Sequence, residues 1–228
     1  MIVENKKFYN KVQVFDSREH AGKLLASLLR GKQFDFCYII PSGGLPVGYG
    51  LLTSNEFKII PFDLMIVKKI QVPWSTEAGM GAVTPDGQVF LNDSLISQIT
   101  ISNKALQEQV VKAKEMIEAL REAFNLKETI SPRGKRVLLL DDGIASGFSM
   151  RAAAHWMNKK QAKEVYIATP TAPLRSLEHL ESVVDGIYCA NIRTGFAFAV
   201  ADAYKNWYDL PTVEAQEYME KLNKLYLV

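Results

Sequence analysis

The stretch VLLLDDGIASGFSMRAAA, residues 137–154, decides the fold. Its apolar start predicts a buried strand that ends at Asp141 and Asp142, and the residues after them lead into a helix. In open α/β sheets, ligands bind beyond the carboxyl ends of the strands. Two adjacent carboxylates repel each other and are costly to bury without partners. We therefore expect both aspartates to face a solvated cleft, where they accept hydrogen bonds from sugar hydroxyls or hold a metal ion through water.

The segment after the aspartates has the composition of a phosphate site. Small residues let the backbone approach a ligand, and free N–H groups at a helix start attract a phosphate dianion. Beside two carboxylates, such a segment predicts a receptor for a sugar phosphate. The alternative is an ordinary turn before a helix, with a serine N-cap and solvated aspartates. The predicted phosphate-binding residues are Ala145, Ser146, Gly147, Phe148 and Ser149.

The rest of the chain alternates between short apolar runs and segments with apolar residues at helical spacing. This alternation predicts an α/β fold with a mostly parallel central sheet and helices on both faces. Pro85, Asp86 and Gly87 lie between two β-like arms and predict a projecting β-hairpin, because proline presets φ and glycine accepts a positive φ. Strands are expected at residues 35–40, 58–68, 136–140, 164–169 and 186–190, and helices at residues 18–29, 47–52, 104–124, 149–158 and 173–184.

The composition limits the class of protein. The chain has 228 residues, 48% hydrophobic and 23% charged, which suits one α/β domain with an elaboration. Its net charge of +2 comes without a clustered basic stripe, which argues against nucleic-acid binding. We find no signal-peptide pattern and no apolar stretch that could span a membrane. Cys37 and Cys189 lie in apolar runs and are expected to be buried thiols, which fits a reducing cytoplasm.

Sequence motifs of other enzyme classes are missing from the chain. It has no G-x-x-x-x-G-K-[ST] phosphate loop of nucleoside triphosphatases and no G-x-S-x-G elbow of serine hydrolases. His20, His155 and His179 do not have the spacing of metal ligands, either among themselves or with the cysteines. The stretch around the two aspartates is therefore the main functional signal.

That stretch resembles the phosphoribosyl-pyrophosphate (PRPP) signature of type I phosphoribosyltransferases, with Ser146 where threonine is usual. The segment PSGGLPVG, residues 41–48, resembles the family's pyrophosphate loop, and VKKIQVPWSTEAGMGAV, residues 67–83, resembles its flexible-loop region. With TPTAP, residues 169–173, these motifs are similar to a group of predicted phosphoribosyltransferases with a PRGG-like loop and a DDGIA[ST]G motif. The resemblance implies a single phosphoribosyltransferase-like domain, residues 1–228, with a flexible loop near residues 70–95 and a C-terminal elaboration near residues 191–228.

The resemblance also implies a role for each matching residue. Asp141 and Asp142 would be catalytic, contacting the ribose hydroxyls and supporting an oxocarbenium-like transition state. Residues 145–149 would hold the 5′-phosphate of PRPP, and the hairpin around residues 85–87 would close over the site. Mg²⁺ would be held mainly by PRPP itself, because it prefers phosphate and water oxygens. The pyrophosphate would be bound by Ser42, Gly43 and Gly44, in a turn that often contains a cis peptide, and by Lys68 or Lys69.

The implied activity is transfer of the 5-phosphoribosyl group from PRPP to a nitrogenous base, with release of pyrophosphate. A purine or pyrimidine is the default acceptor, and Phe196 or Phe198 would stack on it, although core packing also explains these aromatic residues. We expect a homodimer in the cytoplasm that binds neither nucleic acid nor membrane.

One residue departs from the related group. These proteins usually carry arginine where this chain has Ser42, so a fixed positive charge is missing where pyrophosphate would bind. Lys68 or Lys69 would compensate for this loss in an active enzyme. The alternatives are a non-catalytic sensor of PRPP or a nucleotide, and a phosphosugar-modifying enzyme on the same scaffold.

Overall fold

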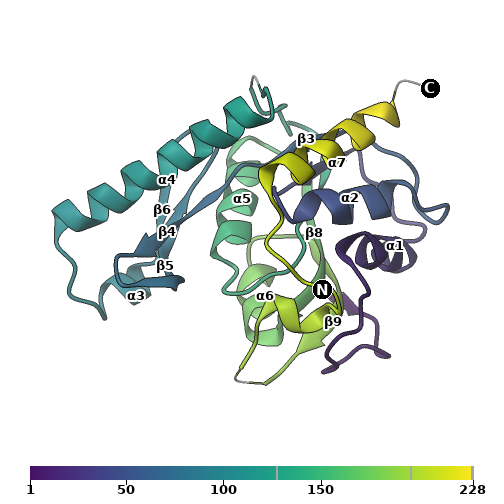
Figure 1. The fold of residues 1–228 in the computed structure, drawn as a ribbon, viewed down its shortest axis with the longest axis horizontal. Helices are drawn as coiled ribbons and strands as arrows, with labels where there is room; N and C mark the ends of the chain where they lie inside the picture. Colours follow the sequence, from purple (N-terminus) through teal and green to yellow (C-terminus); the bar gives the residue numbers. More distant parts are fainter. Residues whose placement is uncertain (127, 196, 227–228) are drawn as a thin grey trace.

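A six-stranded parallel sheet forms the centre of the molecule (Figure 1). The computed structural model describes residues 1–126, 128–195 and 197–226, without the side chains of residues 75–78, 93 and 94. The strand order is β1-β9-β8-β7-β2-β3, and each neighbouring pair among these strands is parallel. This is the α/β architecture that the alternating pattern predicts. The strands are β1 (Ile2–Glu4), β2 (Phe36–Ile39), β3 (Phe62–Leu64), β7 (Arg136–Leu140), β8 (Glu164–Pro173) and β9 (Gly186–Arg193).

Helices cover both faces of the sheet. In β7, Val137 and Leu139 point into the core beneath α5 and α6, whereas Leu138 and Leu140 point into the core beneath α1, α2 and α7. Figure 1 shows these two groups of helices on opposite sides of the sheet. Strands buried on both faces are apolar throughout, which explains the uninterrupted apolar run of β7. The helices are α1 (Arg18–Leu28), α2 (Gly44–Leu52), α5 (Phe148–Lys159), α6 (Leu174–Glu181) and α7 (Thr212–Lys224).

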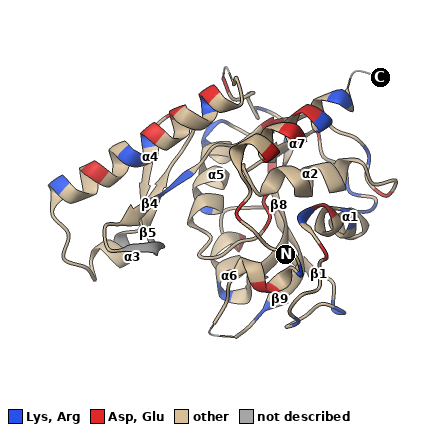
Figure 2. Cartoon of the chain, in the orientation of Figure 1, with Lys and Arg blue, Asp and Glu red and all other residues tan. Residues whose placement is uncertain are grey.

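A second sheet projects from the body and is backed by the long helix α4 (Figure 1). We call this antiparallel sheet, β4-β5-β6, the hood. The predicted hairpin is its β5–β6 half, and β4 adds a third strand. Val110, Ala113 and Ile117 are the buried residues of α4, and Figure 2 shows acidic and basic residues interspersed along this helix. The elements are β4 (Lys68–Val72), β5 (Ser75–Val83), β6 (Val89–Leu91), α3 (Asp93–Ile96) and α4 (Asn103–Ala123).

The structure differs from the sequence-based expectations mainly at element ends. The stretch 58–68 contains only the short strand β3 before β4 begins, because the chain leaves the central sheet after Leu64 and enters the second sheet at Lys68. β8 continues through Pro170 to Pro173, although proline usually ends a strand. The pattern missed β1, which is only three residues long, the short 3₁₀ helix η1 (Val200–Ala203), and α7, in which only Ala215 and Leu222 are buried. Cys37 and Cys189 are buried free thiols, as predicted.

Candidate active site

Two loops meet at the carboxyl edge of the sheet, where β2 and β7 are neighbours. The predicted pyrophosphate loop, which begins at Pro41, follows β2, and the two aspartates follow β7. Gly43 lies directly against Asp142, because a Cβ atom at this glycine would stand 2.0 Å from the Oδ2 atom of Asp142. The first glycine of the predicted loop is therefore required for the close approach of the two motifs.

The rest of the pyrophosphate loop is tightly folded. The peptide bond between Pro41 and Ser42 is cis, as the resemblance implies for this turn. The N–H of Gly44 donates to the carbonyl of Ile40 at 3.2 Å and so already has a partner within the protein. The predicted role of Gly44 as an N–H donor to pyrophosphate is therefore less well supported than that of Gly43.

Asp142 is held by a cation from near the start of the chain. Nε of Arg18 donates to its Oδ2 at 2.7 Å, and the two side chains are only 7% and 15% exposed. The same guanidinium donates to the carbonyl of Tyr208 at 3.0 Å and lies 3.9 Å from the centre of the Trp207 ring. The hydroxyl of Tyr204 donates to the backbone carbonyl of Asp142 at 2.5 Å. The prediction that both aspartates face a solvated cleft is therefore wrong for Asp142, whose charge is compensated inside the protein.

Asp141 has a different environment. Its Oδ1 accepts the backbone N–H of Asp142 at 2.8 Å, and no ion pair holds it within the described part of the chain. Burial raises the pKa of Asp141 well above its ordinary value, and the nearby negative charge of Asp142 raises it further. Among the described residues, Asp141 is thus the carboxylate of the pair that has no ion-pair partner.

Lys68 and Lys69 begin strand β4 and point to opposite faces of the hood, because strand side chains alternate. Burial lowers the pKa of Lys68, and the negative charge of Asp141 partly offsets this effect. The stem of Lys69 lies across β5 at Gly79, where an added Cβ would stand 2.8 Å from its Cγ and Cδ atoms. Lys68 therefore lies in the electrostatic environment of Asp141.

The phosphate loop, residues 145–149, leads into α5 as predicted. Gly147 is the N-cap of this helix, with a left-handed φ of +82°. The first helical hydrogen bond runs from the N–H of Arg151 to the carbonyl of Gly147 at 2.8 Å, so the N–H groups before Arg151 have no partner inside the helix. The extension of β8 supports the loop through Thr171, whose carbonyl accepts the N–H of Ile144 at 2.9 Å, and Ser176 Oγ donates to the carbonyl of Ala145 at 2.6 Å. Free N–H groups on a supported backbone suit a phosphate.

The turn at residues 85–87 does not lie over this edge. Lys160 Nζ is 3.2 Å from Asp86 Oδ2, and Lys159 Nζ donates to Gln88 Oε1 at 2.9 Å. These lysines lie at the C-terminal end of α5, whereas the phosphate loop lies at its N-terminal end. A helix of this length spans about 18 Å. In this conformation the turn therefore lies away from the site, and its closure over the site stays a prediction.

The segment after β9 packs beside the aspartates. An added Cβ at Gly143 would stand 2.2 Å from Cγ1 of Val200, so this segment lies against the aspartate motif. Phe198, two residues earlier, is half-buried. Phe196 lies outside the described residues. The position of Phe198 fits the predicted base-binding role without testing it.

Arg18, Tyr204 and Ser176 contact the predicted motifs and were missed by the sequence reasoning. Arg18 follows the N-cap Ser17 at the first turn of α1 and looks there like an ordinary solvated charge. No local pattern links it to an aspartate 124 residues away in the sequence. Only the fold brings these residues to the site.

Comparison with known proteins agrees with this geometry. Residues 20–203 match the phosphoribosyl transferase domain, and the chain belongs to this family. It is 27% identical over 218 residues to a Mycobacterium tuberculosis protein named "Putative phosphoribosyl transferase Rv0571c", an alignment that covers 93% of this chain and 48% of that protein. The chain therefore spans about half the length of this relative.

Solved structures align with the chain to different degrees. The protein TT1426 from Thermus thermophilus aligns with a TM-score of 0.71 at 23% identity, over 91% of this chain and 98% of that one. A hypoxanthine phosphoribosyltransferase from Staphylococcus aureus aligns with a TM-score of 0.48 at 13% identity, over 89% and 88% of the two chains. The likeness to TT1426 supports the α/β architecture.

Two further findings concern membrane-spanning helices and clusters of metal-binding side chains. Within the described residues, no helix is long and apolar enough to cross a membrane. No cluster of three or more His, Cys, Asp or Glu side chains that could hold a metal ion occurs in the same part of the chain.

Proposed function

We propose that the chain is a PRPP-dependent phosphoribosyltransferase that moves the 5-phosphoribosyl group to a nitrogenous base and releases pyrophosphate. The observation that carries this proposal is the direct contact between Gly43 and Asp142. It brings the loop expected to hold the leaving group against the carboxylates expected to hold the ribose. The phosphate loop follows at the same edge of the sheet.

The reaction breaks the bond between C1 of the ribose and a pyrophosphate oxygen and forms a bond from C1 to a nitrogen. Positive charge develops on the ribose ring, and negative charge develops on the leaving group. Asp141 stabilises the ring, and Asp142, fixed by Arg18, holds the ribose hydroxyls on the same edge. Lys68 and the backbone of the pyrophosphate loop stabilise the leaving group. Catalysis is then mainly positioning and charge stabilisation.

Mg²⁺ fits this site only together with PRPP. The described residues offer no protein cage for the ion, and one oxygen of Asp142 already accepts from Arg18. Asp141 and Asp142 are the carboxylates that would meet a hydrated ion held by the phosphate oxygens of PRPP. When bound, the ion supplies positive charge to the pyrophosphate.

A direct assay tests this function. The protein is incubated with PRPP, Mg²⁺ and a panel of purine and pyrimidine bases while pyrophosphate is measured. We expect release that depends on one class of base and is lost in Asp141→Asn. Arg133→Gln, an exposed change near the opposite edge of the sheet, should retain full activity. Binding of PRPP by the intact protein without turnover on any base would contradict the proposal.

A non-catalytic PRPP or nucleotide sensor is the second candidate, and Ser42 is the observation that favours it. Arginine at this position would make bidentate contacts to phosphate oxygens, which a serine cannot replace. Ser42→Arg should tighten PRPP by about 1–3 kcal/mol, the scale of a hydrogen bond to a charged group, and leave nucleoside monophosphates unchanged. If turnover appears only in Ser42→Arg, the natural protein is the sensor.

A further inference from the structure

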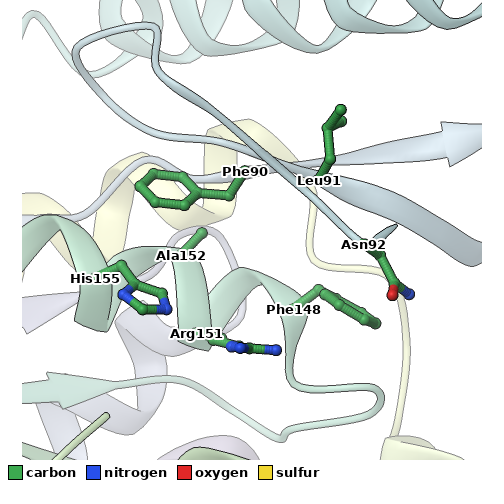
Figure 3. A pocket seen from close by; sticks show the side chains of 7 residues that line it. All are labelled: Phe90, Leu91, Asn92, Phe148, Arg151, Ala152 and His155. Atoms are coloured by element: carbon green, nitrogen blue, oxygen red, sulfur yellow. The ribbon is translucent and has the colours of Figure 1, made fainter. Parts of the chain in front are cut away.

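A groove runs along α5 from the phosphate loop towards the hood. Its larger part, about 490 Å³, lies between the N-terminal end of α5 and α6, and it is lined by Ser146 and Gly147 of the phosphate loop. Its smaller part, about 280 Å³, lies between α5 and β6 (Figure 3). Asn92, Phe148 and Arg151 line both parts. The two hollows are therefore one continuous groove, whose larger part is in the size range of ligand sites.

The groove is positively charged. Arg151 from α5 and Arg175 from α6 line its larger part, together with His179. Both arginines are exposed, and neither forms an ion pair with any residue that the structure describes. The described side chains that line the two hollows include no carboxylate. Two guanidinium groups without acidic partners select an anion, and phosphate suits their planar donor geometry best.

The groove continues from the phosphate loop. This position indicates which kind of anion the groove binds. Ser146 and Gly147 belong both to the phosphate loop and to the groove lining. A ligand whose ribose lies at the aspartates and whose 5′-phosphate lies at the loop would therefore point its next group into the groove. A second phosphate attached to the first would give the arginines an anionic partner.

We propose that the groove binds a second phosphate attached to the 5′-phosphate, so that nucleoside 5′-diphosphates and 5′-triphosphates bind this site. The inference rests on the proposed function, because it takes residues 145–149 as the 5′-phosphate site. Such nucleotides occupy the ribose and 5′-phosphate positions of PRPP and compete with it. The groove would thus make the protein sensitive to the supply of phosphorylated nucleotides.

Nucleotide pairs that differ by one phosphate test this inference. AMP and ADP, and GMP and GDP, are titrated into the full chain without Mg²⁺. We expect each diphosphate to bind about tenfold more tightly than its monophosphate, the effect of one charged hydrogen-bonding contact of about 1.4 kcal/mol. In the double variant Arg151→Gln, Arg175→Gln the ratio should fall to about one, with monophosphate affinity unchanged. Arg133→Gln removes one positive charge far from the groove and should keep the ratio.

The outcomes separate this inference from the proposed function. A ratio of one in the natural protein overturns it, and so does a double variant that weakens both nucleotides equally, because the arginines would then contact the 5′-phosphate itself. If no nucleotide binds, the phosphate loop and the groove are both wrongly assigned. If the ratio holds but no base supports pyrophosphate release, the groove stands and the transferase proposal fails. Both substituted arginines are exposed, so the variants should fold, and thermal unfolding checks this.

Discussion

The two adjacent aspartates belong to two different regions of the molecule. Asp142 is joined to the body, where Arg18 pairs with its carboxylate and the rings of Tyr204, Trp207 and Tyr208 lie against the guanidinium. The charge of Asp141 acts on Lys68, at the start of β4 in the hood, where burial lowers the pKa of the lysine and this charge partly raises it again. One carboxylate is thus neutralised by the protein before any ligand binds, whereas the other is not. Neighbouring residues of one motif therefore need not share one environment, and substitutions should separate the carboxylate that Arg18 holds from the one that it does not.

The largest effect on stability is expected when Arg18, the cation that pairs with Asp142, is replaced. Arg18→Leu should lower the free energy of unfolding by about 3 kcal/mol, because it leaves a mostly buried carboxylate unpaired. Urea denaturation measures the loss. Adding Asp142→Asn to Arg18→Leu should restore part of it. Arg30→Leu breaks an exposed ion pair with Glu56 and should cost at most about 1 kcal/mol. Equal losses in the two arginine variants would mean that Arg18 does not hold Asp142.

A smaller effect is expected from filling the contact between the two loops. Gly43→Ala places a methyl group against the carboxylate that Arg18 fixes, so either the loop or Asp142 must move. We expect a loss of about 2 kcal/mol, the scale of an overpacked site, together with loss of PRPP binding. Gly195→Ala is the control, because the nearest atom to its added Cβ is 3.7 Å away. Unchanged PRPP affinity in Gly43→Ala would place the pyrophosphate elsewhere.

The two lysines at the start of β4, Lys68 and Lys69, test whether the hood contributes to PRPP binding. Lys68→Gln should weaken PRPP about tenfold, because it removes the cation near Asp141, and one charged contact contributes about 1.4 kcal/mol. Lys69→Gln removes the same charge from the opposite face of β4 and should change PRPP affinity less than about threefold, or about 0.6 kcal/mol. Calorimetric titration of both variants decides the matter. A larger effect in Lys69→Gln would reverse the assignment of the two lysines.

The smallest effect expected is a gain of stability when Asp141, the carboxylate that Arg18 does not hold, is replaced. Because folding raises the pKa of Asp141, its contribution to stability is complete below about pH 4, the ordinary value for aspartate, and is lost as the pH rises through the folded value. Asp141→Asn has no carboxyl group to ionise at this position, so the variant does not lose this stability as the pH rises. The variant should be more stable than the natural protein by about 1 kcal/mol at about pH 8, with no gain at about pH 3. Thermal unfolding at both pH values measures the difference, and a uniform gain would contradict the raised pKa.

Local sequence predicted the parts of the site that local geometry builds. The strand before the aspartates, the glycine turn after β2 and the phosphate loop all depend on short-range spacing, and each lies at the expected edge of the sheet. Arg18 was not predictable, because its partner is fixed by packing between distant segments. The position of the 85–87 turn was missed for a similar reason. The residues of the turn predict a hairpin, but they do not predict that the turn contacts the C-terminal end of α5.

The contact of Arg18 with Tyr208 also has a consequence for the order of folding. These residues are 190 positions apart, and Arg18 and Asp142 are 124 positions apart. Contacts between such distant residues require closure of long loops and form slowly compared with local ones. During synthesis, the strands and helices up to β9 can assemble before residue 208 leaves the ribosome. The contacts of Tyr204 with Asp142 and of Tyr208 with Arg18 can form only afterwards. We therefore expect nascent chains that end before residue 204 to form the central sheet without a functional ribose site.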